Sequence, residues 1–365
     1  MDTTLINREE TREPSSRPRK ATKQDHGAST KVISLALQGG GAHGAFTWGV
    51  LDRLLEDERI VFEGISATSA GAMNATVTAY GLTEGGRHGA RQALANFWRR
   101  VSHTGDFSLL QPTPLDRLMG NRGLENSPAY VLFDMMTRLL SPYQFNPMNY
   151  NPLREVLTQV VDFDALRQSC CPVKLFLSAT NVRTGKVKVF ANDEITADAV
   201  LASGCLPFLF QAVEIDGEAY WDGGYMGNPA IFPLIYHCAN RDVVIVHINP
   251  LERTELPRTA AEIMNRINEI SFNSSLMREM RAINFVTDLI DGGAVKENHL
   301  KKMFIHGISA EAEMSRLSVA SKLCADWSFL TELRDVGRAT AEGWLAQQFD
   351  SLGRRSTIDI QLTYL

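Results

Sequence analysis

The sequence predicts an α/β fold with a mainly parallel, buried sheet, and two observations carry that prediction. A short apolar run, a sharp turn of small residues and a helix follow one another twice between residues 31 and 81. A further run, DVVIVHINP at 242–250, has the apolar character of a strand buried on both faces. Strands that alternate with helices are typical of parallel sheets whose faces are covered by those helices.

The first unit begins at Lys31. The run VISLALQ predicts a strand, three glycines follow at once, and AHGAFTWGVLDRLLEDE places Phe46, Val50 and Leu54 at helical spacing. The second unit begins with the strand VFEGISATS and continues with AGAMNATVTAYG, a helix of small residues.

Residues 87–164 are predicted to form a looser insertion, because Pro and Asn interrupt their short helical stretches. Long irregular insertions often form lids or binding surfaces. The sheet is expected to resume with PVKLFLSATN and KVKVFAN, which a turn at Thr184-Gly185 joins into a hairpin.

Beyond Pro257 the chain becomes mostly helical. Residues 259–291 form one long amphipathic helix or two, MFIHGIS is a last strand, and residues 326–353 form a closing helix. We therefore divide the chain into a disordered tail at 1–30, an α/β domain at 31–250 and a helical extension at 251–365 packed on that domain. The basic cluster Arg17–Lys23 in the tail is either a solvated linker or a contact for anionic lipid.

The composition of the chain limits the classes of partner that it can bind. The formal net charge of −5 and the pI of about 5.9 argue against a nucleic-acid partner. No apolar run is long enough to predict a spanning helix, but a local apolar patch would permit peripheral membrane contact. Five cysteines without a Cys-x-x-Cys pair predict reduced thiols, hence a cytoplasmic location, and neither a metal site nor an organic cofactor is predicted.

The glycine turn has two interpretations. Gly39, Gly40, Gly41 and Gly44 fit the Gly-x-Gly-x-x-Gly pattern of a dinucleotide-binding turn. That pattern expects an acid at the end of a second strand, whereas the acids at 56–58 precede that strand. Alternatively, backbone N–H groups freed by the glycines at a helix N-terminus form an oxyanion hole. Both interpretations bind an anion, and the rest of the chain must decide between them.

Ser69 stands in the second sharp turn, Ala67-Thr68-Ser69-Ala70-Gly71. A strand-to-helix turn of this kind presents a nucleophilic serine and needs small neighbours, as in Gly-x-Ser-x-Gly, where Ala67 here replaces the first glycine. Ser66 is a rival serine without the same small residues after it. The alternative role of Ser69 is to cap the following helix.

Asp222, Gly223 and Gly224 follow a short strand, and by themselves they indicate an ordinary tight turn. Together, however, the segments QGGGAHGAF, ATSAGA and YWDGGYMGNP resemble the patatin-like phospholipases in order and approximate spacing. PVKLFLSATNVRTGKVKVF and ADAVLASGCLPFLFQAVEIDG are also similar to segments of that family, so the resemblance covers residues 32–250.

The resemblance implies a three-layer α/β sandwich and a Ser–Asp dyad, with Ser69 as nucleophile and Asp222 as base. Gly39, Gly40 and Gly41 would then donate the oxyanion hole, and Gly44, Gly71, Gly223 and Gly224 would support the turns. Family members typically cleave fatty acyl esters of phospholipids or related lipids. The family usually has Arg or Lys where His43 stands here, and we expect His43 to buttress the turn.

A triad is the rival arrangement, because His237 and His247 follow Asp222 in the order Ser, Asp, His. A dyad would need a raised pKa at Asp222, for which Tyr220, Trp221 and Tyr225 could provide an apolar environment.

The sequence therefore predicts a serine acyl hydrolase with a lipid ester substrate, peripheral membrane contact and, as an open question, a homodimer. One alternative is an esterase for non-phospholipid esters such as intracellular storage polyester. The other is a nucleotide-binding protein whose C-terminal helices form an interaction module.

Overall fold

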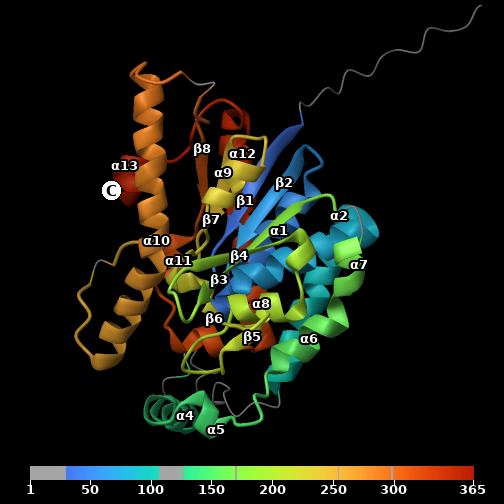
Figure 1. Ribbon diagram of the computed structural model, residues 1–365, viewed down its shortest axis with the longest axis vertical. Coiled ribbons are helices and arrows are strands. Elements are labelled where there is room, and N and C mark those ends of the chain that lie inside the picture. Colours follow the sequence, from blue (N-terminus) through green and yellow to red (C-terminus); the bar gives the residue numbers. More distant parts are fainter. Residues whose placement is uncertain (1–29, 107–123, 125–126, 169–170, 254, 297–298) are drawn as a thin grey trace, which may run out of the picture.

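A central sheet lies between two layers of helices (Figure 1). The computed structural model describes residues 30–106, 124, 127–168, 171–253, 255–296 and 299–365, so the predicted tail lies, apart from Thr30, outside the described residues. Within them the sheet has eight strands in the order β5-β6-β3-β2-β1-β7-β8, with β4 paired to β3. The strands are β1 Lys31–Leu37, β2 Ile60–Ala67, β3 Lys174–Asn181, β4 Val187–Ala191, β5 Val213–Ile215, β6 Glu218–Asp222, β7 Asp242–Val246 and β8 Phe304–Ile308.

The sheet is mainly parallel, as predicted. Strands β3, β2, β1, β7 and β8 run parallel, while β4, β5 and β6 join β3 or each other antiparallel. In the register of β1 with β2, Leu37 lies beside Ala67. The glycine turn and the serine turn therefore leave the same edge of the sheet from neighbouring strands.

Each face of the sheet has its own helices. One layer holds α1 (Gly44–Glu56), α2 (Ala70–Asp106) and α12 (Trp327–Gln348), extended by α6 (Pro152–Val160), α7 (Phe163–Gln168) and α8 (Ala197–Ser203). The other holds α9 (Phe232–His237), α10 (Ala260–Asp291) and α13 (Ile360–Tyr364). This is the predicted three-layer arrangement.

Helix α2 corrects one prediction. It continues to Asp106, through the first part of the segment expected to be loose, with a break at Gly85 and Gly86 where Gly86 has a φ of 59°. After the break, Ala90, Leu94 and Phe97 are buried at helical spacing, and this apolar stripe continues the helix against the core.

The remaining insertion is a series of short helices, as predicted, where it is described. Helices α4 (Pro128–Leu139), α5 (Pro142–Phe145) and α6 each begin with a proline, whose fixed φ suits the first helical turn. No residue of α4 is buried, although the helix is rich in Leu, Met, Val and Phe. Residues 107–123 and 125–126 of the segment predicted to be loose lie outside the described residues.

The C-terminal part joins both the sheet and the helical layers. Residues 260–291 form one helix of 32 residues rather than two, capped by the Thr259 side chain. Strand β8 pairs with β7 along the edge of the sheet, as predicted from MFIHGIS. Between β8 and α12 lie α11 (Glu311–Met314) and the short helix η4 (Ala320–Leu323).

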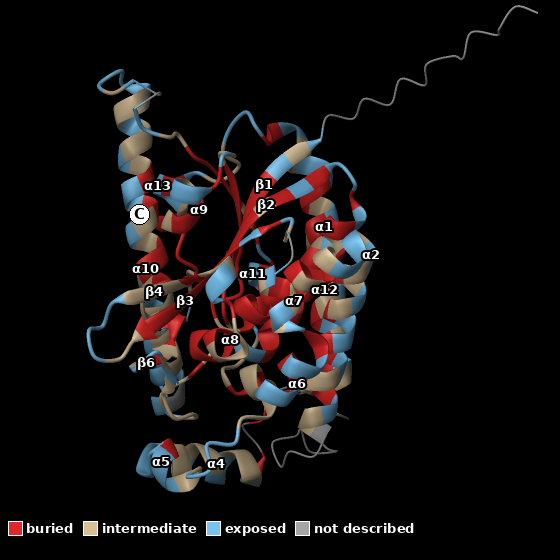
Figure 2. Ribbon diagram, turned by 45° about the vertical axis from the view of Figure 1, so that its right-hand side comes forward, coloured by how far each residue is buried: buried red, intermediate tan, exposed pale blue. Residues whose placement is uncertain are grey.

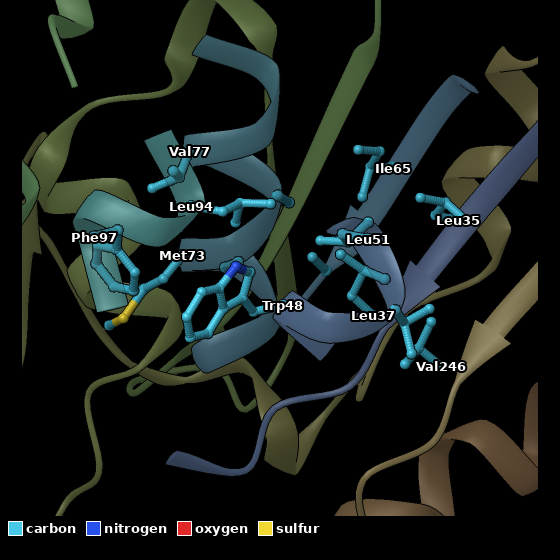
Figure 3. Packing of buried hydrophobic residues seen from close by; sticks show 14 of the residues in the cluster. Leu35, Leu37, Trp48, Leu51, Ile65, Met73, Val77, Leu94, Phe97 and Val246 are labelled. Atoms are coloured by element: carbon cyan, nitrogen blue, oxygen red, sulfur yellow. The ribbon is translucent and has the colours of Figure 1, made fainter. Parts of the chain in front are cut away.

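Two apolar clusters hold the layers together. The larger fills the space between the sheet and α1, α2 and α12, with Trp48, Leu51, Ile65, Phe97 and Val246 among its members (Figure 3). The smaller lies on the opposite face and includes side chains of α9, α10 and α13. Figure 2 shows buried residues continuing through the sheet between the two helical layers.

Helices α1 and α12 pack closely enough for glycine to be required at their crossing. A Cβ at Gly337 would lie 2.1 Å from the carbonyl oxygen of Phe46, and a Cβ at Gly49 would lie 1.9 Å from that of Arg334. These contacts are with backbone atoms, so no side-chain rotation would relieve them.

We expect Gly337→Ala to lower the free energy of unfolding by about 1–3 kcal/mol, because the helices must separate. The matched control is Gly343→Ala on the same helix, where a Cβ meets nothing within 4 Å and should add about 0.5–1 kcal/mol. Urea denaturation of both variants measures the difference. Equal midpoints would contradict the close packing.

Candidate active site

Ser69 occupies a strained turn between β2 and α2. Its φ of 56° is unusual for a residue with a side chain, and it is the conformation expected of an exposed nucleophile at a sharp elbow. A Cβ at Gly71 would lie 2.4 Å from the Leu37 carbonyl oxygen, and a Cβ at Gly44 would lie 2.8 Å from the Cβ of Ala70. Both glycines are therefore needed for the elbow to pack against β1 and α1.

Ser66, the rival serine, is fully buried in β2, and its hydroxyl donates to the carbonyl oxygen of Ala230. Ser69 is only partly buried, and its N–H donates to Ser203 Oγ at 3.0 Å. Of the two serines, only Ser69 combines partial exposure with the elbow conformation.

Asp222 ends strand β6 and faces Ser69 closely enough for the serine hydroxyl to stabilise the carboxylate. Only 1% of Asp222 is exposed, and its Oδ1 accepts a hydrogen bond from Gly224 N at 2.7 Å. A Cβ at Gly223 would lie 2.1 Å from the Ser178 carbonyl oxygen, and one at Gly224 would overlap the Phe272 ring at 1.7 Å. The two glycines thus let the chain turn directly after the acid.

Burial raises the pKa of Asp222 from 3.8 to about 7. Desolvation of the carboxylate is the largest cause, and hydrogen bonds from Gly224 N and Ser69 together with the charge of Lys322 oppose it. Of the expected aromatic neighbours, Tyr220 is buried against Phe190, and Tyr225 interacts with Asp222: burial, and secondly the charge of Asp222, raise the pKa of Tyr225 to about 12. A base with a pKa near neutrality is well matched to proton transfer.

The glycine turn touches the elbow. A Cβ at Gly39 would lie 2.5 Å from the Cβ of Ser69, so a side chain at Gly39 would displace the serine. The N–H of Gly39 is already donated to Asn228 Oδ1 at 2.7 Å, which commits it to the scaffold. Among the described residues, the N–H groups of Gly40 and Gly41 have no acceptor. Of the three expected oxyanion donors, these two are available.

Three polar residues that the sequence did not single out hold this turn. Gln38 is fully buried, and its Oε1 accepts from the N–H groups of Ile248 at 2.9 Å and Asn249 at 3.0 Å. Asn249 Nδ2 donates to the Gly39 carbonyl oxygen at 2.8 Å, and Gln38 Nε2 donates to the carbonyl oxygen of Asn228 at 3.3 Å. The one sequence signal that could have pointed to these residues was a polar Gln directly after an apolar strand.

Comparison with known proteins identifies the family of this chain. The sequence profile described as Patatin-like phospholipase matches residues 35–235, more than half of the chain. The chain belongs to the patatin-like phospholipase family. No curated protein sequence matches it significantly.

Two solved structures show a distant similarity to this patatin-like chain. One is VipD from Legionella pneumophila, with 16% identity, a TM-score of 0.33, and coverage of 84% of this chain and 67% of that one. The other is full-length ExoU of Pseudomonas aeruginosa in complex with SpcU, with 14% identity, a TM-score of 0.28, and coverage of 92% and 77%.

His43 buttresses the patatin-like glycine turn, in agreement with its predicted role. The ring is 3% exposed, and its Nε2 lies 2.7 Å from Ser321 Oγ. Burial, and secondly the charge of Lys322, hold the pKa of His43 well below its ordinary value, so the ring is neutral at pH 7.

Neither rival histidine contacts Ser69 or Asp222 in the part of the chain that is described. His247 Nε2 lies 2.8 Å from the hydroxyl of Tyr364, and burial lowers the pKa of His247 to about 4. His237, at the end of α9, stacks on Phe176 with ring centroids 5.6 Å apart. These contacts give both rings a place in the helical layer that carries α9 and α13.

Two of the acids that follow the glycine turn, and that a dinucleotide site would need, are paired with arginines. Asp57 forms an ion pair with Arg59 at 2.6 Å, and Glu56 pairs with Arg91 at 2.6 Å and Arg338 at 2.9 Å. In the described ranges, no group of three or more His, Cys, Asp or Glu side chains could hold a metal ion. No described helix is long and apolar enough to cross a membrane.

A cleft of about 1690 Å³ opens between α4, the first half of α10 and residues 311–320. Ser69 and Asp222 do not line it, but Ala320 does, and the next residue in the chain, Ser321, contacts His43. Phe208 and Leu256 in its wall are 68% and 82% exposed. The cleft thus lies close to the residues that support the glycine turn, and its wall carries charged as well as apolar side chains.

Ser69→Ala should abolish labelling by a fluorophosphonate probe, because the probe reacts with an activated serine hydroxyl. Ser66→Ala is the matched control, and a correctly folded form of it should still be labelled. Gel fluorescence with a melting curve for each variant measures this. Full labelling of Ser69→Ala would refute the assignment.

The pKa of Asp222 predicts an acid limb in the pH profile of kcat/KM for a soluble ester. Since the carboxylate is the active form, the rate should fall about tenfold per pH unit below 7 and level off above it. Asp222→Asn should lower kcat by about 10²–10⁴-fold and lose this limb. A wild-type profile that stays flat down to about pH 5 would contradict the role of Asp222.

Proposed function

We propose that this chain is a serine acyl hydrolase in which Ser69 and Asp222 form a dyad that cleaves fatty acyl esters of phospholipids or related lipids. The observation that carries the proposal is the juxtaposition of the Ser69 elbow with a buried carboxyl whose pKa is about 7. Membership of the patatin-like phospholipase family supports the lipid substrate.

In the acylation step, Ser69 Oγ attacks the ester carbonyl carbon while its proton passes to the Asp222 carboxylate. The carbonyl oxygen becomes negative and accepts hydrogen bonds from Gly40 N and Gly41 N, a stabilisation of typically about 3 kcal/mol per donor. The bond between the carbonyl carbon and the leaving oxygen then breaks, and protonated Asp222 gives its proton to the leaving alcohol.

Deacylation repeats these steps with water. Asp222 takes a proton from a water molecule as the water oxygen attacks the acyl carbon of the acyl-enzyme. The tetrahedral intermediate collapses, the fatty acid leaves, and the proton returns from Asp222 to Ser69 Oγ. The histidine of a triad is not required, because the buried carboxyl itself titrates near neutrality.

We further propose that the face formed by α4 and residues 140–150 docks on a phospholipid bilayer. Leu132, Met135 and Leu139 of α4 are 61%, 53% and 73% exposed, and Met148 is 87% exposed. This face lies at the end of the molecule toward which β1 and β2 run (Figure 1), and other residues of α4 line the cleft. A lipid that leaves a bilayer at this face would meet that cleft, where Phe208 and Leu256 offer apolar contact. The cytoplasmic location remains a prediction from cysteine content.

A substrate panel tests the chemistry. Wild type should release fatty acid from phospholipids or related lipid esters, and Ser69→Ala should not. Polyhydroxyalkanoate granules, a storage polyester, form the second arm. Release of hydroxyacids from the granules with no fatty acid from lipids would replace the proposed substrate by the polyester.

The double substitution Leu132→Ser and Met135→Ser should lower activity on phospholipid vesicles about tenfold and leave kcat/KM on a short soluble ester unchanged, because only docking is lost. The matched control is Leu362→Ser on α13, which is 85% exposed away from the cleft. Vesicle co-sedimentation and light scattering accompany the assay. A dimer that dissociates in the double variant, with unchanged vesicle binding, would assign this face to a second copy instead.

A further inference from the structure

The short helix η4 packs on the glycine turn, although it lies more than eighty residues beyond the end of the family match. A Cβ at Gly41, whose φ is 60°, would lie 2.4 Å from the carbonyl oxygen of Lys322. The preceding residue, Ser321, holds the His43 ring at 2.7 Å. Two consecutive residues of η4 therefore contact the segment that presents the oxyanion donors.

Lys322 reaches the same turn through its side chain. Its Nζ donates to Asn249 Oδ1 at 2.9 Å, and Asn249 Nδ2 donates to the carbonyl oxygen of Gly39 at 2.8 Å. Asn249 is 3% exposed and Lys322 is partly buried. The hydrogen bonds thus form a continuous path from the lysine ammonium group to the residue that packs on Ser69.

Lys322 is also a charge at the site. It acts on Asp222 and His43, and burial lowers its own pKa, while the neighbouring Glu269 raises that pKa and Arg253 lowers it. Glu269 is already paired with Arg253 at 2.6 Å and Arg266 at 3.2 Å. Its negative charge is therefore largely offset by the arginines, and the ammonium group remains the cation that acts on Asp222.

We infer that Lys322 is a positioning residue of the catalytic site, which holds the glycine turn through Asn249 and places a positive charge beside Asp222 and the oxyanion donors. This inference rests on the proposed hydrolase function. In the glycine turn, His43 is neutral where the family usually has Arg or Lys. Lys322, from the C-terminal part of the chain, provides a cation in its place.

The charge acts in two ways that favour the reaction. A cation near Asp222 stabilises the carboxylate, which is the form that accepts the serine proton. It also favours the negative oxygen that develops at Gly40 and Gly41 during attack. Gly224 N and Ser69 Oγ also stabilise the Asp222 carboxylate, but they do so through hydrogen bonds, whereas Lys322 acts through a positive charge.

The test measures kcat and KM against pH on a short soluble ester for Lys322→Met, Lys322→Gln and Lys322→Arg. Gln keeps a donor for Asn249 without the charge, and Arg keeps both. Lys301→Met is the matched control, because Lys301 is also partly buried and donates to a carbonyl oxygen, that of Cys238, at 2.6 Å. Melting curves confirm that each variant is folded.

We expect the acid limb to move to higher pH in Lys322→Met and Lys322→Gln, by up to about one pH unit, with kcat severalfold lower at pH 6.5 and KM little changed. Lys322→Arg and Lys301→Met should keep the wild-type limb. If Met prevents folding, Gln still decides the question.

A lower kcat in Lys322→Gln with an unmoved acid limb would show a merely structural lysine and overturn the inference. Wild type that hydrolyses no ester and takes no fluorophosphonate label would instead overturn the proposed function. The two failures are thus distinguishable.

Discussion

The close approach of the glycine turn to the Ser69 elbow is the contact on which the rest of the site depends. Strands β1 and β2 are direct neighbours, so both turns leave the sheet side by side and their backbones must share one small volume. Positions 39 and 71 have room for hydrogen only, because a Cβ would lie 2.5 Å from the Ser69 Cβ or 2.4 Å from the Leu37 carbonyl oxygen. The result places the nucleophile directly against the glycine turn.

The acid comes to this point from the antiparallel side of the sheet, and its burial opposes stability. Asp222 binds its proton more tightly in the folded chain than in the unfolded one, since its pKa rises from 3.8 to about 7. Its contribution therefore favours folding most below pH 3.8 and is lost progressively as the pH rises to 7. Above pH 7 the ionised carboxyl lowers the free energy of unfolding by about 4 kcal/mol. The apolar core on both faces of the sheet must offset the destabilisation that this buried, ionised base causes.

Local patterns were enough to predict the parallel strands and the two sharp turns, whereas Asp222 was proposed as the base only through the family resemblance. Ser69 and the glycines are recognisable because a sharp turn leaves its requirement for small residues in the sequence itself. Asn228, Asn249 and Lys322 carry no such signal, since they contact the turn from sequence positions about 190 to 280 residues away. The extension of α2 past Gly86 was missed because a pair of glycines normally ends a helix, whereas the core contacts of Ala90 and Leu94 continue it.

The C-terminal part of the chain belongs to the same physical unit as the elbow. Strand β8 extends the sheet beside β7, and α12 packs on α1 through backbone contacts at Gly49 and Gly337. Helix η4 lies between these two elements, so their packing fixes where Ser321 and Lys322 meet the glycine turn. A displacement of α12 would therefore act on η4 and on the turn that holds the oxyanion donors. The family match ends at residue 235, but the surroundings of Ser69 and Asp222 are completed only at residue 322.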